Sequence, residues 1–291
     1  MTFRICFARH LMVAAAFYNI IIIDATALTS PIWCPSVVTL KFVSQSHPDS
    51  FWRKLTSSEP RREFALKNVS VTFQPPVTTL LLGESSSGKS TILRLISGSE
   101  SPISGNVEIS NDCATLRPSR PIYLDSRPSY GQNEIVEDIW SNAGAFDKSN
   151  ESPNRKTLLK ELSKLLKVPL QSKILDLSMS EVYLCRIGET VLESTTINSA
   201  QHMESTTPTY LDEPNVLKLP APILLLDEWL DNETSTVVQR VQTALHELAQ
   251  NGAVIVCVTH KPHLFSSRGN RQLRRVTLSR GQVLSVAETG V

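Results

Sequence analysis

The chain has little of what marks a disulfide-stabilised, zinc-binding or strongly charged protein. Its five cysteines are odd in number and widely spaced, with no C-x-x-C pair, so we expect neither a disulfide framework nor a structural zinc site. A formal net charge of +1 over 291 residues gives no electrostatic reason to expect nucleic acid or acidic lipid as the main partner. No apolar run after residue 34 is long enough to cross a membrane as a helix.

The first 34 residues differ from the rest of the chain. Arg4 and Arg9 precede a short apolar run over residues 11–23, and the small residues Ala25-Thr26-Ala27 follow it. A basic flank, a short apolar core and an A-x-A sequence predict a targeting-like leader or anchor over residues 1–34. Plastid-type import, an uncleaved anchor and a mistaken start site are the open alternatives.

Beyond residue 34, strand-like and helix-like segments alternate, which predicts a parallel sheet with crossover helices. The expected strands are 37–43, 64–73, 77–82, 107–109, 223–226, 253–258, 276–278 and 283–285. The expected helices are 90–96, 156–166, 178–192 and 237–249. We therefore expect an α/β domain over residues 35–291, with a mostly parallel core, an antiparallel β portion, an inserted helical subdomain at about 130–192 and a polar insertion at about 193–220.

A phosphate-binding pattern, G-x-x-x-x-G-K-[ST], follows the strand expected at 77–82 and opens a helix. Its residues are Gly83, Glu84, Ser85, Ser86, Ser87, Gly88, Lys89, Ser90 and Thr91. Such a loop turns backbone N–H groups and the positive end of a helix dipole toward phosphate. Lys89 is expected to reach the β- and γ-phosphates, and the Ser90 hydroxyl to bind Mg²⁺. An ordinary Gly/Ser loop is the alternative.

Two acids follow a second buried strand. Four apolar residues, 223–226, end in Asp227 and Glu228. A buried strand that delivers a carboxylate to the sheet edge is what magnesium coordination requires. We expect Asp227 on the magnesium side and Glu228 to orient and polarise the attacking water. The alternative is a pair of solvated loop acids.

Together these segments resemble the ATPase domains of ABC transporters. The resemblance covers roughly residues 37–290 and rests on four segments in the family's order: 64–70, 83–91, 93–98 and 102–109. It implies a P-loop NTPase fold, with ATP and Mg²⁺ as ligands. The reaction would be in-line attack of water on ATP, with charge neutralised by Lys89, magnesium and backbone amides.

The resemblance also implies roles for two histidines. His260 comes two residues after the strand expected at 253–258 and takes the place of the family's switch histidine, so we count it with Glu228 and Lys89 as catalytic. His47 takes the place of the aromatic residue that stacks on adenine. An ordinary loop histidine is the alternative at position 47.

Three segments depart from the family's pattern. Residues 177–181 stand for the glycine-rich signature: Ser178 keeps a hydroxyl for the γ-phosphate on a partner domain, but Met179 and Ser180 replace glycines. Asp125 stands where a Gln should end the strand and is a further candidate ligand for magnesium. Leu230-Asp231 resembles a compressed D-loop, with Trp229 in the usual place of a proline.

The resemblance implies an ATP-binding subunit that hydrolyses ATP to drive a transporter or transporter-like membrane complex. Its expected partners are a second ATP-binding domain, in a homo- or heterodimer, and a separate transmembrane subunit, with no nucleic acid. The departures motivate a second hypothesis, a nucleotide-binding regulatory or assembly subunit with weak or no hydrolysis. A soluble ABC ATPase acting on nucleic acid or in cofactor assembly is a third alternative, and a plain P-loop kinase is a fourth. The expected location is membrane-associated on an ATP-containing side, with plastid-type targeting or the cytoplasm as alternatives.

Overall fold

In the computed structural model, the strand before the phosphate-binding loop lies inside a mostly parallel sheet, with strands on both sides of it. The structure describes residues 33–46, 64–111, 118–143, 153–201, 219–265 and 272–289. Strand β4 (Thr78–Gly83) pairs in parallel with β10 (Leu273–Ser279) on one side and with β9 (Val254–Val258) on the other. β4 is a central strand buried on both faces, and it reads as a largely apolar run in the sequence.

The large sheet has six strands in the order β11-β10-β4-β9-β8-β6. Its other members are β8 (Ile223–Asp227), β6 (Ile122–Leu124) and β11 (Gln282–Thr289). β11 is antiparallel to β10 across the turn at residues 280–281, so the strands expected at 276–278 and 283–285 form a hairpin. All other neighbours are parallel, so the chain leaves β4, β6, β8 and β9 at one edge of the sheet.

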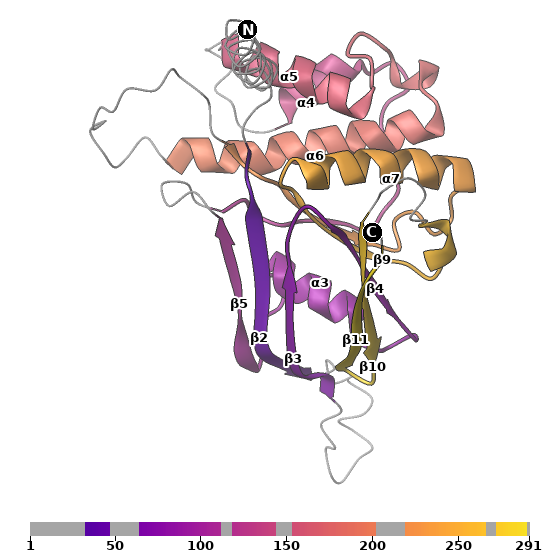
Figure 1. Ribbon diagram of the computed structural model, residues 1–291. Coiled ribbons are helices and arrows are strands. Elements are labelled where there is room, and N and C mark those ends of the chain that lie inside the picture. Colours follow the sequence, from indigo (N-terminus) through magenta and orange to yellow (C-terminus); the bar gives the residue numbers. More distant parts are fainter. Residues whose placement is uncertain are drawn as a thin grey trace, which may run out of the picture.

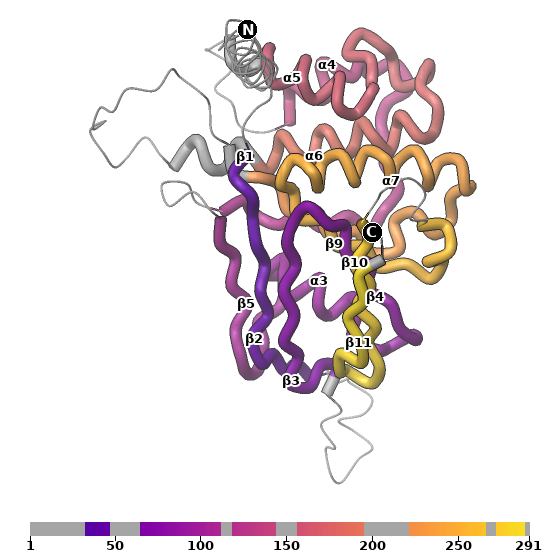
Figure 2. The backbone as a smooth tube through the Cα atoms, in the orientation of Figure 1, coloured from indigo at the N-terminus to yellow at the C-terminus, as the bar shows by residue number. Residues whose placement is uncertain are grey.

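A second, three-stranded sheet is entirely antiparallel. It places β2 (Ser36–Ser46) between β3 (Phe64–Phe73) and β5 (Ser104–Asn111). The last strand of the large sheet, β11, lies beside β3, so the end of the described chain closes onto this sheet (Figure 2). A short parallel pair, β1 (Trp33–Cys34) with β7 (Leu219–Pro220), completes the strands.

Side-chain alternation along the central strands divides the core in two. Ile223 and Leu225 of β8 face α3 (Lys89–Ser97) and the antiparallel sheet, whereas Leu224 and Leu226 face the other helices. Successive side chains of a strand point to opposite faces, so an apolar run satisfies both layers. Each fully buried aliphatic side chain stabilises the fold by about 1.5–3 kcal/mol.

The second face of the sheet is covered by helices. α6 and α7 lie across the strands, and α4 and α5 lie beyond them (Figure 1). Their bounds are α4 Val136–Asn142, α5 Pro153–Leu166, α6 Met179–Gln201 and α7 Ser235–Gln250, with single 3-10 turns at Ile174–Asp176 and Pro262–Leu264. Within the described ranges, no helix has both the length and the apolar character needed to cross a bilayer.

The expected strands and helices are present, with one correction. α6 runs to Gln201, so the predicted start of the polar insertion, at about residue 193, is too early. Ser and Thr over residues 194–196 suggested a loop, but extending an anchored helix costs little because each added residue gains a hydrogen bond. Residues 202–218, and residues 1–32 of the expected leader, lie outside the described residues.

The cysteines also require a correction. Cys34 is disulfide-bonded, which the wide spacing of cysteines along the chain did not indicate. Cys185 and Cys257 are buried and free, as expected for small core residues. Burial raises the pKa of each of these two thiols to about 12, so both stay protonated at neutral pH.

One tight contact fixes α4 against α6. The Trp140 indole N–H donates to the carbonyl of Cys185 at 2.9 Å, and its ring covers Gly188 in the middle of α6. A Cβ atom at position 188 would lie 2.2 Å from Trp140 Cζ2. The glycine is there for the close approach of the ring, not for a turn.

We therefore predict that Gly188→Ala destabilises the protein. In an open helix this change stabilises by about 1 kcal/mol, but here overpacking should cost about 1–3 kcal/mol. Denaturant midpoints of the two proteins measure the difference. In a Trp140→Leu background the same change should cost less, and an equal cost in both backgrounds would contradict the contact.

Candidate functional site

The phosphate-binding loop can form only with glycine at its last turn. Gly88 has φ 103°, in the left-handed region, and precedes the first residue of α3. A Cβ atom there would lie 2.6 Å from both the Ala65 carbonyl oxygen and Leu66 Cδ2. The antiparallel sheet therefore presses directly on the loop and holds the N-terminus of α3 at the end of β4.

Lys89 is folded back over this loop. Its ammonium donates to the carbonyls of Gly83 at 2.9 Å and Glu84 at 2.8 Å, and the residue is only 5% exposed. Burial lowers the pKa of Lys89, while the charges of Glu228 and Asp227 oppose this shift. The loop thus holds a positive charge against two of its own backbone carbonyls.

Ser90 and Asp227, two residues expected to bind Mg²⁺, meet across the sheet edge. The Ser90 hydroxyl donates to Asp227 Oδ1 at 3.1 Å. Neighbouring oxygens around octahedral Mg²⁺ are about 3.0 Å apart, so this pair fits two adjacent ligands of that ion. Both groups are hard oxygen donors, the type that magnesium selects.

Tyr123 is a site residue that the sequence did not reveal. Tyr123 lies on β6, and its hydroxyl donates a hydrogen bond to Oδ2 of Asp227 at the end of the neighbouring strand β8. Burial and this bond raise the pKa of Tyr123, so the phenol stays protonated and orients the carboxylate. Only the strand order, in which β6 neighbours β8, brings the two residues together.

Glu228 and His260 form a second pair at the same edge. His260 Nε2 lies 2.7 Å from Glu228 Oε1, and both side chains are about half-exposed. Glu228 has φ 52°, a left-handed conformation that costs a residue with a side chain about 1–2 kcal/mol. Its N–H donates to the Val258 carbonyl at 3.0 Å, which holds this turn against β9. A strained acid facing solvent is typical of functional positions.

Asp231 fastens the His260 loop to the loop after β8. Its carboxylate accepts from the Thr259 hydroxyl at 2.5 Å and the His260 N–H at 2.8 Å, and its carbonyl accepts from Lys261 Nζ at 2.5 Å. Ligand atoms of Glu228, Asp231 and His260 lie within 4.8 Å of one another, close enough to hold a metal ion. Because donors already engage both Asp231 oxygens and an ammonium lies beside them, we interpret the group as a hydrogen-bonded cluster.

Two predicted site residues have weaker support. Asp125 follows β6 at the same edge as Asp227, because Leu124 pairs with Leu226, and its side chain is exposed. The structure brings it near the expected magnesium ligands without burying it. His47 lies outside the described residues, so its adenine role stays a prediction.

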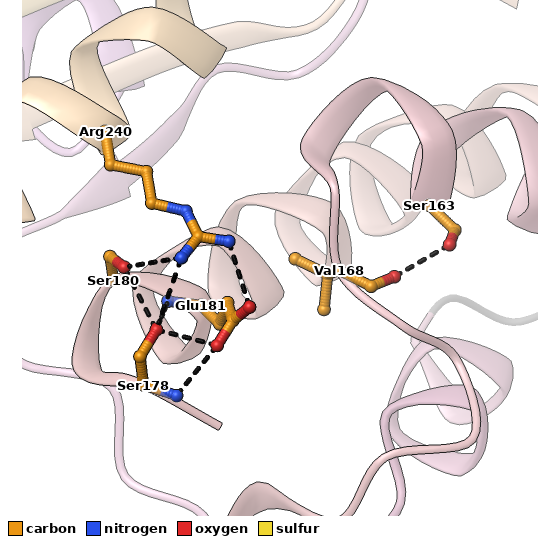
Figure 3. Close-up of polar contacts among 6 residues, drawn as sticks. All are labelled: Ser163, Val168, Ser178, Ser180, Glu181 and Arg240. Carbon is orange, nitrogen blue, oxygen red and sulfur yellow. Dashed lines mark hydrogen bonds and ion pairs between the residues drawn. The ribbon is translucent and has the colours of Figure 1, made fainter. Parts of the chain in front are cut away.

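Ser178 is engaged within its own helix. Its N–H and hydroxyl donate to Glu181 Oε2 at 2.8 and 2.7 Å, a capping box at the N-terminus of α6 (Figure 3). Arg240 of α7 pairs with Glu181 at 2.9 Å and approaches the hydroxyls of Ser178 and Ser180. Met179 is exposed where the resemblance implies a glycine. The hydroxyl is kept, but it is already paired.

The Glu181 contacts predict a pH dependence. Burial alone would raise the pKa of Glu181, but hydrogen bonds from Ser178 and the charge of Arg240 outweigh it and lower the pKa. Such a carboxyl stabilises the fold above its unfolded-state pKa, and this stabilisation is lost as the pH falls through the folded-state pKa. The stability advantage of wild type over Glu181→Gln should therefore be full at pH 7 and shrink below the ordinary value of 4.5.

Urea midpoints across this pH range measure the difference. Glu161→Gln is the matched control, because it removes the charge from an exposed ion pair with Lys164 on α5. A Glu181→Gln difference that does not change with pH would show that the capping carboxylate is not held in its charged form.

Comparisons with known proteins agree with this geometry. A family model described as ABC transporter matches residues 66–283. The energy-coupling factor transporter ATP-binding protein of Streptococcus pneumoniae is 27% identical over 208 residues, covering 69% of this chain and 67% of that protein. The Fe(3+) ions import ATP-binding protein of Brucella melitensis is 28% identical over 202 residues, covering 67% and 50%. The chain spans less of other curated relatives, only 36% of the D-allose import ATP-binding protein of Escherichia coli and 29% of a Mycobacterium tuberculosis ABC transporter ATP-binding protein.

Solved structures show the same fold. An ATP-binding cassette of an ABC transporter in its ADP conformation has a TM-score of 0.58 at 15% identity, covering 87% of this chain and 91% of that one. A dimeric cassette in a post-hydrolysis state, bound to ADP and Pi, has a TM-score of 0.53 at 18% identity, covering 87% and 100%. Since the family model covers most of the chain and the fold agrees, the chain belongs to the ABC transporter family, as one of its ATP-binding domains.

Proposed function

We propose that this chain is an ATP-binding subunit that hydrolyses ATP to drive a transporter or transporter-like membrane complex. The observation that carries the proposal is the meeting of three groups at one sheet edge: Lys89 in its loop, Ser90 with Asp227, and Glu228 with His260. A phosphate cradle alone supports binding. The added acid–histidine pair, half-exposed beside the cradle, is what hydrolysis needs.

Family membership supports the partners. ABC ATP-binding domains bind ATP, generally with Mg²⁺, dimerise, and work with transmembrane subunits. Several of the relatives that the chain matches are named as import or energy-coupling ATP-binding proteins. We propose that this chain pairs with a second ATP-binding domain and acts with a separate membrane subunit. Residues 1–34 remain our candidate for a targeting or anchoring segment.

The residues divide the chemistry between binding and attack. Lys89 and the N-terminus of α3 hold the phosphates, and Ser90 with Asp227 would hold magnesium. When bound, the ion neutralises charge on the β- and γ-phosphate oxygens. Glu228 accepts a hydrogen bond from a water molecule and directs the oxygen of that water at the γ-phosphorus. The phosphorus–oxygen bond to ADP breaks, giving ADP and phosphate. His260, 2.7 Å away, fixes the Glu228 carboxylate.

A second candidate function is a nucleotide-binding regulatory or assembly subunit with weak or no hydrolysis. The observation that favours it is the state of Ser178, whose hydroxyl donates to Glu181 within the same helix turn. Met179 and Ser180 also add side chains where close backbone approach would need glycine. This function predicts tight ATP binding without turnover.

Lys89→Ala should weaken ATP binding severely, by about 100-fold or more, because a buried ammonium paired with phosphate is lost and its carbonyl partners stay unpaired. Isothermal titration with ATP and Mg²⁺ measures the affinity. Lys164→Ala, which removes an exposed lysine of α5, is the control and should bind as wild type does. An affinity unchanged by Lys89→Ala would refute the phosphate site.

Glu228→Gln should keep ATP bound and slow steady-state turnover by about 10²- to 10⁴-fold, the usual contribution of a general base. Glu247→Gln on α7 is the control for loss of a carboxylate far from the site. Phosphate release at saturating ATP measures the rate. Equal rates for wild type and Glu228→Gln would remove Glu228 from the mechanism, and tight binding with no wild-type turnover would favour the regulatory function.

A further inference from the structure

Trp229, the residue after Glu228, is hydrogen-bonded to the segment that follows the neighbouring strand β6. Trp229 is only 4% exposed, and its indole N–H donates to the Ser126 carbonyl at 2.6 Å. Ser126 belongs to the segment that leaves β6 at the same edge. The chain turns at once, because the Asp231 N–H donates to the Glu228 carbonyl at 3.1 Å. This tight turn leaves the Trp229 ring inside the protein while Glu228 faces solvent.

The Trp229 ring packs on the first turns of α6. Tyr183 is fully buried, and its ring meets Trp229 edge to face, with centroids 4.7 Å apart and planes at 73°. This is a favoured geometry for aromatic pairs. The Tyr183 hydroxyl donates to Glu233 Oε1 at 2.9 Å. Tyr183 therefore contacts the loop after β8 at two points, one apolar and one polar.

An ion pair closes the group. Glu233 is paired with Arg127 at 2.8 Å, and its side chain is only 8% exposed. A carboxylate this buried needs its partners, because leaving it unpaired would be costly. The segments after β6 and β8 and the start of α6 are thereby joined in one cluster. We call Ser126, Arg127, Tyr183, Trp229 and Glu233 the aromatic clamp.

Ser178 lies close to this clamp along α6. It stands five residues before Tyr183, at the helix N-terminus, where Arg240 of α7 holds Glu181 at 2.9 Å (Figure 3). α7 itself begins at Ser235, just after Glu233. The start of α6 is therefore fastened both to the Glu228 loop and to the helix that follows it.

We propose that Trp229 and Tyr183 are positioning residues that make the placement of Ser178 depend on the placement of Glu228. The inference rests on the proposed function, in which Glu228 acts on the ATP that this chain binds and Ser178 faces the ATP of the paired domain. The aromatic clamp then carries a change at one nucleotide site to the other. Close packing transmits such small displacements because a filled core does not deform freely.

Two substitutions test the clamp: Tyr183→Phe leaves the packing nearly unchanged, whereas Trp229→Phe also makes the buried ring smaller. Trp229→Phe removes the hydrogen bond to Ser126, and Tyr183→Phe removes the hydrogen bond to Glu233, while both keep an aromatic ring. Tyr130→Phe is the matched control: it removes the same kind of bond, from Tyr130 to Glu189 of α6 at 2.6 Å, outside the clamp. Arg127→Gln, at a side chain that is 60% exposed, tests the ion pair if a ring substitution impairs folding.

The first readout is amide hydrogen exchange over residues 178–183 of the full chain, with and without ATP and Mg²⁺, in a Glu228→Gln background that keeps ATP intact. We expect ATP to slow this exchange, and the response to be lost in Trp229→Phe and Tyr183→Phe but kept in Tyr130→Phe. The second readout is steady-state turnover with Glu228 present. There kcat should fall about 10- to 100-fold with KM nearly unchanged, since small misplacements cost that much.

The outcomes separate this inference from the proposed function. ATP binding by wild type with no exchange response at residues 178–183, or a response that survives in both ring variants, overturns the clamp and leaves the proposed function standing. A lower melting temperature with kcat and exchange response unchanged shows a merely structural role and also overturns it. Failure of wild type to bind ATP overturns the proposed function first, and the clamp with it.

Discussion

The site depends on the parallel pairing of β4, β9 and β8. Each of these strands is buried on both faces, so their interiors are largely apolar, and the charged groups lie where the strands end. Because the strands run the same way, those ends coincide, and Gly83, Asp227 and Val258 lie along one edge. The same parallel arrangement that buries both faces of the sheet therefore also brings the residues of the candidate site together. The antiparallel sheet and the helical layer serve it by keeping water from the strands.

The charged side chains at this edge of the sheet fit a ligand that brings both phosphate and a divalent cation. Lys89 lies near Asp227 and Glu228, so two carboxylates face one ammonium before any phosphate arrives. Burial lowers the pKa of Lys89, and the charges of Glu228 and Asp227 oppose this shift without cancelling it. A triphosphate adds further negative charge, which the dipole of α3 and a divalent cation between Ser90 and Asp227 can offset. Binding of nucleotide without the cation would leave Asp227 close to an uncompensated anion.

The sequence predicted the parts of the site that depend on contiguous residues. Gly83–Thr91 and Asp227-Glu228 each follow an apolar run, so strand, turn and acid could be inferred together, and the comparisons confirm the family and fold. Tyr123 and Trp229 could not be found this way, because their contacts depend on β6 lying beside β8 and on how α6 crosses the loop. The end of α6 was misjudged because composition, rather than helical continuity, decided it. The roles of the site residues themselves, with His47 and the leader, stay predictions.

The capping box at α6 has a consequence for association. The Ser178 hydroxyl and N–H already donate to Glu181, so any phosphate that approaches this helix end finds its donors in use. Contact with a second nucleotide site would then be an exchange of one anion for another, with Arg240 near both. The free energy of such an exchange is a difference between two similar terms, and is small compared with either. A helix end built this way favours contacts that form and release readily over contacts that persist.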